Sequence, residues 1–181
     1  MVRGGVRERP NRHAWKACEV KASVGSNPTP SAMVNVESAM VLALEEARNA
    51  ASRGEVPVGA VMLHRGEVIA RAGNRRESVV DPLGHAELLV IRDAALQLGT
   101  WKLVECTLVV TLEPCIMCAG AILHSRIPHV VFGAFDLDSG ACGSMYNVLD
   151  DPRLNHRAIV TGGVMNKDCS TLLADFFANR R

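Results

Sequence analysis

Long uncharged apolar runs are missing from this 181-residue chain, although 48% of its residues are hydrophobic. No segment reaches the roughly 18 uncharged residues that a membrane-spanning helix needs, and we find no apolar signal-peptide core. An internal repeat is also absent. The length suits one domain with a sizeable core, so we expect a single globular domain that does not enter a membrane.

A second Cys-x-x-Cys pair is missing as well, which limits what the cysteines can do. Of six cysteines, Cys115 and Cys118 form the only such pair. A lone pair is typical of a structural zinc half-site or of a redox pair. A structural zinc would need a further ligand, and a redox pair would leave His85 and Glu87 unexplained. Six cysteines with a metal motif and no secretion signal indicate a reducing cytoplasm.

The residues that point to chemistry are His85 and Glu87, in Gly-His-Ala-Glu, and the two cysteines of Pro-Cys-Ile-Met-Cys. His85, Cys115 and Cys118 provide one imidazole and two thiolates, which can hold a tetrahedral zinc and leave its fourth position for water. Glu87 is then a carboxylate beside that water, where a proton carrier is needed. The pattern predicts a catalytic zinc site with Glu87 as its acid–base residue.

The predicted local structure brings these motifs to two helix starts. Residues 107–111 form a β-branched apolar run, and we expect a helix over 115–125 with Pro114 in its first turn. His85 begins another predicted helix, over 85–98, which ends at Gly99. Two helix starts facing one ion is a geometry that the sequence permits.

The remaining pattern alternates strands with helices. A helix over 36–53 begins after Asn35, a favourable cap, and a hairpin follows around His64-Arg-Gly66. Such alternation predicts an α/β fold, a three-layer α/β/α sandwich around a mixed five-stranded sheet. The expected strands are 58–63, 67–72, 107–111, 129–134 and 158–161, and the last helix is 167–179.

Beyond the metal motif, several stretches resemble the bacterial tRNA-specific adenosine deaminase family, within the cytidine deaminase superfamily. The similarity covers about residues 36 to 181, and the run from Leu112 to Arg126 is nearly continuous. The resemblance implies a cytidine-deaminase-like fold, one Zn²⁺ per subunit, a homodimer and no nucleotide cofactor. The other matching stretches are Gly54–Val61, Asn74, Asp81-Pro82 and Leu154–Arg157.

The implied reaction is hydrolysis of the wobble adenosine of a tRNA anticodon to inosine, with release of ammonia. By this resemblance His85, Cys115 and Cys118 hold the zinc and Glu87 carries the proton. The anticodon loop would be bound by Asn74, Asp136, Asn155 and Arg157. From residue type alone, Asn74 is also typical of a turn and Asp136 of a solvated loop.

Two other functions remain open at this point. A deaminase of a free base or nucleotide, such as guanine or cytosine, would share the zinc chemistry. A zinc-stabilised RNA-binding subunit without activity would be a different class, although such a subunit is expected to have lost Glu87.

The first 32 residues differ in composition from the rest. They carry six basic and two acidic residues, whereas residues 33–181 carry 14 and 17. A basic arm for RNA, a transit peptide and a segment that is not normally translated are the alternatives. Glu8, Glu19 and the lack of an amphipathic stripe argue against a transit peptide. We expect a disordered extension over 1–32 and a deaminase domain over 33–181.

Residues Gly25-Ser-Asn-Pro28 favour the third alternative, because they can be back-translated as GGT TCG AAT CCN, the T-arm consensus of a tRNA gene. Our hypothesis is that translation normally begins at Met33 and that a tRNA gene overlaps the preceding segment. Sequencing the DNA upstream of Met33 tests it: a cloverleaf is expected there, and other codons at 25–28 would exclude it.

Overall fold

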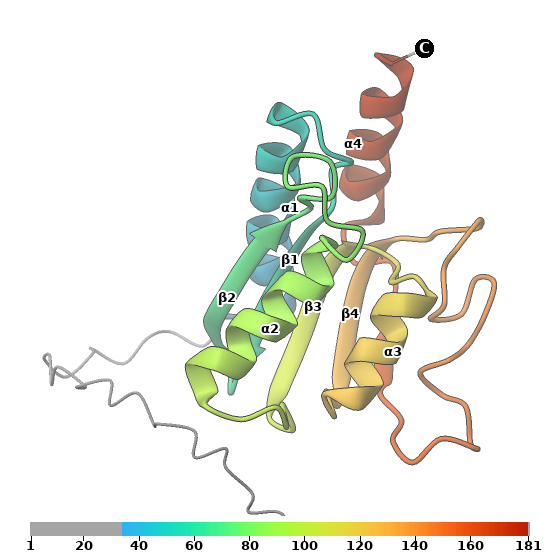
Figure 1. Ribbon diagram of the computed structural model, residues 1–181. Helices are drawn as coiled ribbons and strands as arrows, with labels where there is room; N and C mark the ends of the chain where they lie inside the picture. The colour runs from blue at the N-terminus through green and yellow to red at the C-terminus, as the bar shows by residue number, and fades with distance from the viewer. Residues whose placement is uncertain (1–33, 181) are drawn as a thin grey trace, which may run out of the picture. The chain divides into compact units, whose positions relative to one another are not determined.

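The computed structural model describes residues 34–180, which form one α/β unit (Figure 1). The predicted extension over residues 1–32, and Met33 itself, lie outside the described residues. The elements in chain order are α1 (Val36–Ser52), β1 (Gly59–His64), β2 (Glu67–Gly73), α2 (Ala86–Leu98), β3 (Cys106–Leu112), α3 (Ile116–His124), β4 (His129–Ala134), β5 (Ile159–Thr161) and α4 (Asn166–Ala178).

The five strands form one sheet in the order β2-β1-β3-β4-β5. β1 pairs antiparallel with both β2 and β3, whereas β3–β4 and β4–β5 are parallel pairs. The predicted mixed five-stranded sheet is therefore confirmed, and its strands lie close to the ranges that the sequence indicated.

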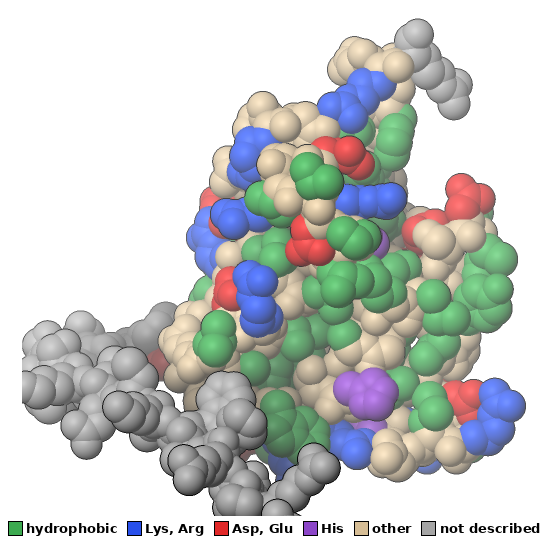
Figure 2. All heavy atoms as spheres, viewed as in Figure 1, with side chains coloured by type: hydrophobic (Ala, Val, Ile, Leu, Met, Phe, Trp, Pro, Cys, Tyr) green, Lys and Arg blue, Asp and Glu red, His purple; other side chains and the backbone are tan. Residues whose placement is uncertain are grey.

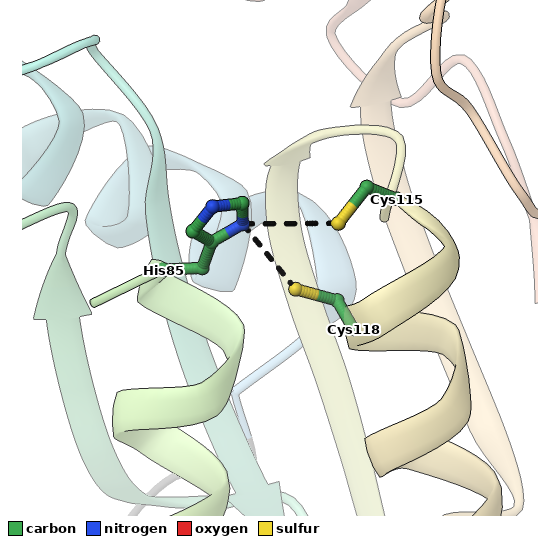
Figure 3. A group of neighbouring side chains, drawn as sticks. All are labelled: His85, Cys115 and Cys118. Atoms are coloured by element: carbon green, nitrogen blue, oxygen red, sulfur yellow. Dashed lines mark hydrogen bonds between the residues drawn. The ribbon is translucent and has the colours of Figure 1, made fainter. Parts of the chain in front are cut away.

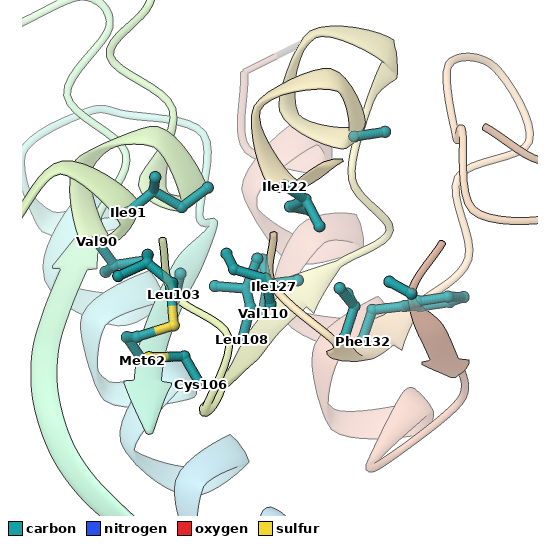
Figure 4. Close-up of a cluster of buried hydrophobic side chains, with 14 of the residues drawn as sticks. Met62, Val90, Ile91, Leu103, Cys106, Leu108, Val110, Ile122, Ile127 and Phe132 are labelled. Carbon is teal, nitrogen blue, oxygen red and sulfur yellow. The ribbon is translucent and has the colours of Figure 1, made fainter. Parts of the chain in front are cut away.

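Helices cover both faces of the sheet, as the predicted three-layer sandwich requires. In Figure 1, α2 and α3 lie on one face, and α1 and α4 lie on the other. Alternate residues of the central strands supply each side: Met62 and Leu108 belong to the core under α2 and α3, whereas Val61 and Val109 pack with α1. The larger core, shown in Figure 4, includes the fully buried Ile122 of α3. Within residues 34–180, no helix combines the length and the apolar character of a membrane span.

The topology brings several loops to one edge of the sheet. The parallel strands β3 and β4 both end there, and the antiparallel β1 begins there, because Leu112 pairs with Ala134 and Ala60 pairs with Val110. β2 also ends at this edge, since Gly73 pairs with Gly59. Ligand sites of α/β sheets lie characteristically beyond the carboxyl ends of the strands.

The predicted starts of α2 and α3 were each one residue too early, and this difference affects the metal motif. α2 begins at Ala86 and α3 at Ile116, so His85 and Cys115 are N-caps with extended backbones at φ −74°, ψ 143° and φ −72°, ψ 173°. Pro114 precedes the cap and does not lie in the first turn. A cap residue departs from the helical path, so its side chain is free to face a neighbouring element.

The packing of α1 on β1 depends on a glycine. A Cβ atom added to Gly59 would overlap the carbonyl oxygen of Ala43 and the backbone nitrogen of Ala47, both in α1. Backbone atoms cannot move away as a flexible side chain can. Only glycine therefore allows this helix to approach the strand so closely.

We predict that Gly59→Ala lowers the free energy of unfolding by about 3 kcal/mol, as overpacking against a rigid backbone does. Gly120→Ala is the matched control, because a Cβ there meets no atom within 4 Å outside the local helix backbone. Alanine is a better helix former than glycine, so the free energy of unfolding of this variant should be unchanged or higher by up to about 1 kcal/mol. Urea denaturation of both variants measures the difference. If the two variants had equal urea midpoints, the close contact between Gly59 and α1 would not have the proposed effect on stability.

Candidate metal centre and catalytic pocket

Three potential metal ligands meet at the starts of α2 and α3. Nδ1 of His85 lies 3.8 Å from Sγ of Cys115 and 3.6 Å from Sγ of Cys118. Figure 3 shows the imidazole and the two thiol groups pointing toward one another across the space between the two helices. All three donor atoms lie within 4.8 Å of one another. The geometry that the sequence permitted, two helix starts facing one point, is the one observed.

These distances fit a zinc ion. With Zn–S of about 2.3 Å and Zn–N of about 2.05 Å at tetrahedral angles, nitrogen and sulfur ligands lie about 3.6 Å apart. The separations from His85 agree with this value to about 0.2 Å. One imidazole and two thiols are also a ligand set that zinc prefers. The residues present therefore suit zinc in both chemistry and spacing, with one tetrahedral position left for a ligand that the protein does not supply.

The surroundings favour a negative charge on the sulfur atom of Cys115. His85 and Cys115 cap two helices whose positive N-terminal ends face the site. A hydrogen bond with Cys118 is the main reason that the pKa of Cys115 falls to about 4. The same bond, together with burial, raises the pKa of Cys118. The hydrogen bond with Cys115 raises the pKa of His85.

A small cavity of about 190 Å³ is lined by two of the three ligands, His85 and Cys115. Glu87 reaches it from the first turn of α2 and is only 4% exposed, and this burial raises the pKa of its carboxyl group. The other lining residues are Val56, Val58, Asn74, Arg76, Glu77, His85, Leu112, Glu113, Cys115, Asp136 and Ser139. The carboxyl group of Glu87 and two of the metal ligands thus line one partly polar cavity.

One wall of this cavity is the loop after β2, and Glu55 holds it. The fully buried carboxylate of Glu55 accepts hydrogen bonds from the backbone N–H groups of Glu77 (3.1 Å) and Ser78 (2.7 Å) and from Nδ2 of Asn74 (3.4 Å). Burial alone would raise the pKa of Glu55, but the backbone hydrogen bonds from Ser78 and Glu77 outweigh it and lower the pKa. The loop is therefore organised around an ionised buried group.

The opposite wall is the loop after β4, and Glu113 holds it in a similar way. The side chain of Glu113, 2% exposed, accepts from the backbone N–H groups of Asp136 (3.1 Å), Cys142 (3.0 Å) and Ser144 (3.0 Å), and from the Ser144 hydroxyl. Glu113 directly precedes Pro114-Cys115, so one residue links this wall to the metal ligands.

Sequence reasoning did not single out Glu55 or Glu113 as site residues. Both are acidic residues next to an apolar residue: Glu55 precedes Val56 shortly before β1, and Glu113 follows Leu112, the last residue of β3. Buried acids are rare unless they are paired or hydrogen-bonded, so an acid in such a context is the signal that was available.

The predicted nucleic-acid contacts fall into two groups. Asn74 and Asp136 line the cavity that holds Glu87. Asn155 instead accepts a 2.7 Å hydrogen bond from Arg126, and Arg157 pairs with Asp150 at 3.4 Å. Arg157 lines a broader hollow of about 700 Å³, but that hollow contains none of the metal ligands, so the smaller cavity is the better candidate for chemistry.

Asp136 has a structural task as well. Its carboxylate accepts hydrogen bonds from the backbone N–H groups of Asp138 and Ser139, both at 3.0 Å, and from the Ser139 hydroxyl at 2.6 Å. These bonds outweigh the effect of burial and lower the pKa of Asp136. A contact between Asp136 and a nucleic acid stays a prediction.

Comparison with known proteins places this site in a family. Residues 33–134 match the cytidine and deoxycytidylate deaminase zinc-binding region. The tRNA-specific adenosine deaminase of Bacillus subtilis is 49% identical over 149 residues, which cover 82% of this chain and 92% of that protein. The corresponding protein of Haemophilus influenzae is 46% identical over 146 residues, 80% of this chain and 84% of the relative.

Solved structures agree with this placement. One of them comes from a study of A-to-I editing by tRNA:A34 deaminases at the wobble position of transfer RNA. It has a TM-score of 0.72 and a sequence identity of 44%, and the match covers 75% of this chain and 98% of that chain. A guanine deaminase from Nitrosomonas europaea also has a TM-score of 0.72, at 26% identity over 84% of this chain and 90% of that chain. From the His-Cys-Cys cluster, the mixed sheet and these matches together, the chain belongs to the zinc-binding cytidine and deoxycytidylate deaminase family.

Proposed function

We propose that this protein hydrolyses the wobble adenosine of a tRNA anticodon to inosine and ammonia. The observation that carries the proposal is the cavity that Glu87 lines together with His85 and Cys115, whose donor atoms lie within 4.8 Å of that of Cys118. Its occurrence in a chain that is 49% identical to a tRNA-specific adenosine deaminase supports tRNA adenosine as the substrate.

In this proposal His85, Cys115 and Cys118 hold the zinc. When bound, zinc supplies the Lewis acidity that lowers the pKa of a coordinated water toward neutrality. Glu87 takes one proton from the water that adds to C6 of adenine and delivers a proton to the departing exocyclic nitrogen. One buried carboxylate thus serves both steps, and water and adenosine become inosine and ammonia without any other reactant.

In this proposal, residues in the two walls of the cavity recognise the nucleotide. Asn74 comes from the loop after β2 and Asp136 from the loop after β4, so a base that entered would lie between them. An anticodon loop is single-stranded, so its target base can turn out of the stack at little cost. Asn155 and Arg157 lie on loops outside the cavity, where they would contact other parts of the RNA.

Deamination of a free base is the competing function, because the chain is also similar to a guanine deaminase. The two substrates differ in size far more than in chemistry. Purified protein should therefore be offered an anticodon stem–loop, free guanine and free adenine in parallel, with ammonia and inosine as readouts. Ammonia from guanine alone would replace our proposal.

We predict that Glu87→Ala abolishes inosine formation in the stem–loop, with a loss of at least about 100-fold in kcat, as expected when an acid–base group is removed. Zinc content, measured by atomic emission, should stay at the wild-type level because the three metal ligands are intact. Inosine is quantified by nucleoside analysis of the digested stem–loop.

Glu105→Gln is the control, since Glu105 is exposed and pairs with Arg65 at 2.6 Å, outside the cavity. This variant should retain wild-type activity. If Glu87→Ala kept its zinc and remained active, Glu87 could not be the proton carrier.

We further propose that the active form is a homodimer. Support comes from exposed apolar side chains beside the cavity: Ile116 of α3 is 59% exposed, and Val79, Val80 and Leu83 of the loop before α2 are 56%, 88% and 55% exposed. Figure 2 shows hydrophobic side chains gathered where this loop meets α3. A second copy could cover this surface and enlarge a platform that is small for an anticodon loop.

Analytical ultracentrifugation tests the assembly. We predict that the wild-type protein sediments as a dimer at micromolar concentration and that Ile116→Lys shifts it toward the monomer, because a charge would be buried in the interface. Val41→Lys, at a 43% exposed position of α1 on the other face of the sheet, should leave the dimer intact. A monomeric wild-type protein would contradict the proposal.

A further inference from the structure

Asn74 is fixed in the cavity wall at three points. Its backbone N–H donates to the carbonyl of Val58 at 2.9 Å, and its own carbonyl accepts from Nη2 of Arg53 at 3.5 Å. Its side-chain Nδ2 donates to Oε2 of Glu55 at 3.4 Å. The backbone contacts set where the residue lies, but only the bond to Glu55 sets how its amide group is turned.

The contact with Glu55 decides which amide atom faces away. A carboxylate is an acceptor only, so it attracts the NH₂ end of the amide and repels the oxygen end. No hydrogen bond to Oδ1 of Asn74 is found among residues 34–180, and none of their buried side-chain nitrogen or oxygen atoms lacks a partner. Oδ1 is therefore accessible to solvent, and Asn74 is a lining residue of the cavity.

Glu55 is well placed to enforce this orientation, because its own side chain is held in place by burial and by several hydrogen bonds. The side chain is fully buried and is held by two backbone N–H groups, those of Glu77 and Ser78, at 3.1 and 2.7 Å. These donors leave the carboxylate little freedom to follow a turn of the Asn74 amide. If the amide reversed, the buried charged group would lose one of its three donors and would face the amide oxygen instead, which is unfavourable.

We propose that Glu55 is a positioning residue for substrate recognition: it holds the Asn74 amide so that Oδ1 is offered to the cavity as a hydrogen-bond acceptor. The matching group on the target nucleoside is then a donor, either a ribose hydroxyl or the exocyclic amine. Glu55 acts through Asn74 and touches neither the metal ligands nor the reacting atoms. The substrate assignment rests on the proposed function, whereas the orientation of the amide does not.

Glu55→Gln is the informative substitution, because it keeps the size of the side chain and supplies a donor. The new amide can donate to Oδ1 of Asn74 and so allow the Asn74 amide to reverse. The first measurement needs no substrate: NMR of the zinc-loaded protein, in which the Asn74 side-chain NH₂ signals are identified by their absence in Asn74→Ala. These signals should shift in Glu55→Gln and stay unchanged in the control Glu105→Gln.

The second measurement is steady-state deamination of the anticodon stem–loop. Glu55→Gln should raise KM roughly tenfold, the effect of losing one good hydrogen bond, with kcat changed by less than about twofold. In the Asn74→Ala background the same substitution should alter KM by less than about twofold, because its effect passes through Asn74. Urea denaturation and zinc content of each variant verify that the fold and the metal centre are retained.

A stem–loop with 2′-deoxyadenosine at the target position distinguishes the two donors. The KM effect of Glu55→Gln disappears on this substrate if the ribose hydroxyl is the donor and persists if the amine is. Should Glu55→Gln fail to fold, Glu55→Asp serves instead, since it keeps the charge but withdraws it from Asn74.

Two results would overturn the proposal. One is an unchanged Asn74 side-chain signal in a folded Glu55→Gln protein. The other is an equal KM effect of that substitution with and without Asn74. If the wild-type protein forms no inosine at all, the proposed function fails, but the NMR comparison still decides whether Glu55 orients Asn74.

Discussion

The candidate site depends on buried carboxylates that accept hydrogen bonds from backbone N–H groups. Glu55 and Glu113 each sit behind one wall of the cavity, and each binds two or more amides of a loop that has no regular structure of its own. A buried acceptor without these donors would cost about 1–3 kcal/mol or more, so each carboxylate and its loop stabilise one conformation together. The loops are thereby shaped before any ligand arrives.

The metal ligands are positioned by different means. His85 and Cys115 occupy N-cap positions, and Cys118 lies in the first turn of α3, so their side chains are placed by helices that pack firmly on the sheet. The helices thus position the metal ligands, while the carboxylate-held loops form walls of the cavity. This separation suits a family in which a tRNA deaminase and a guanine deaminase share the fold, because loops can change without disturbing the metal centre.

Much of this architecture was accessible from the sequence. Periodicity and cap residues predicted the order and approximate limits of every helix and strand, and the His-x-Glu and Pro-Cys-x-x-Cys motifs predicted the cluster of His85, Cys115 and Cys118. The first residue of α2 and of α3 was missed, because propensity does not distinguish a cap from the first helical residue. Glu55 and Glu113 were overlooked because their partners are backbone groups 22 to 31 residues away, and only the fold brings them near. The separate surroundings of Asn155 and Arg157 could not be foreseen either, since they depend on how the long loop after β4 runs.

The mixed sheet also has a consequence for the order in which the molecule can fold. α1, β1 and β2 come from the consecutive residues 36–73 and contact one another locally, so they can assemble early. The metal ligands come from two later helices that meet only when β3 has inserted beside β1, which is a longer-range event. Zinc therefore finds its full set of ligands only in a nearly complete fold. Its binding energy should act mainly by slowing the unfolding of the finished domain, with little effect on how fast the domain forms.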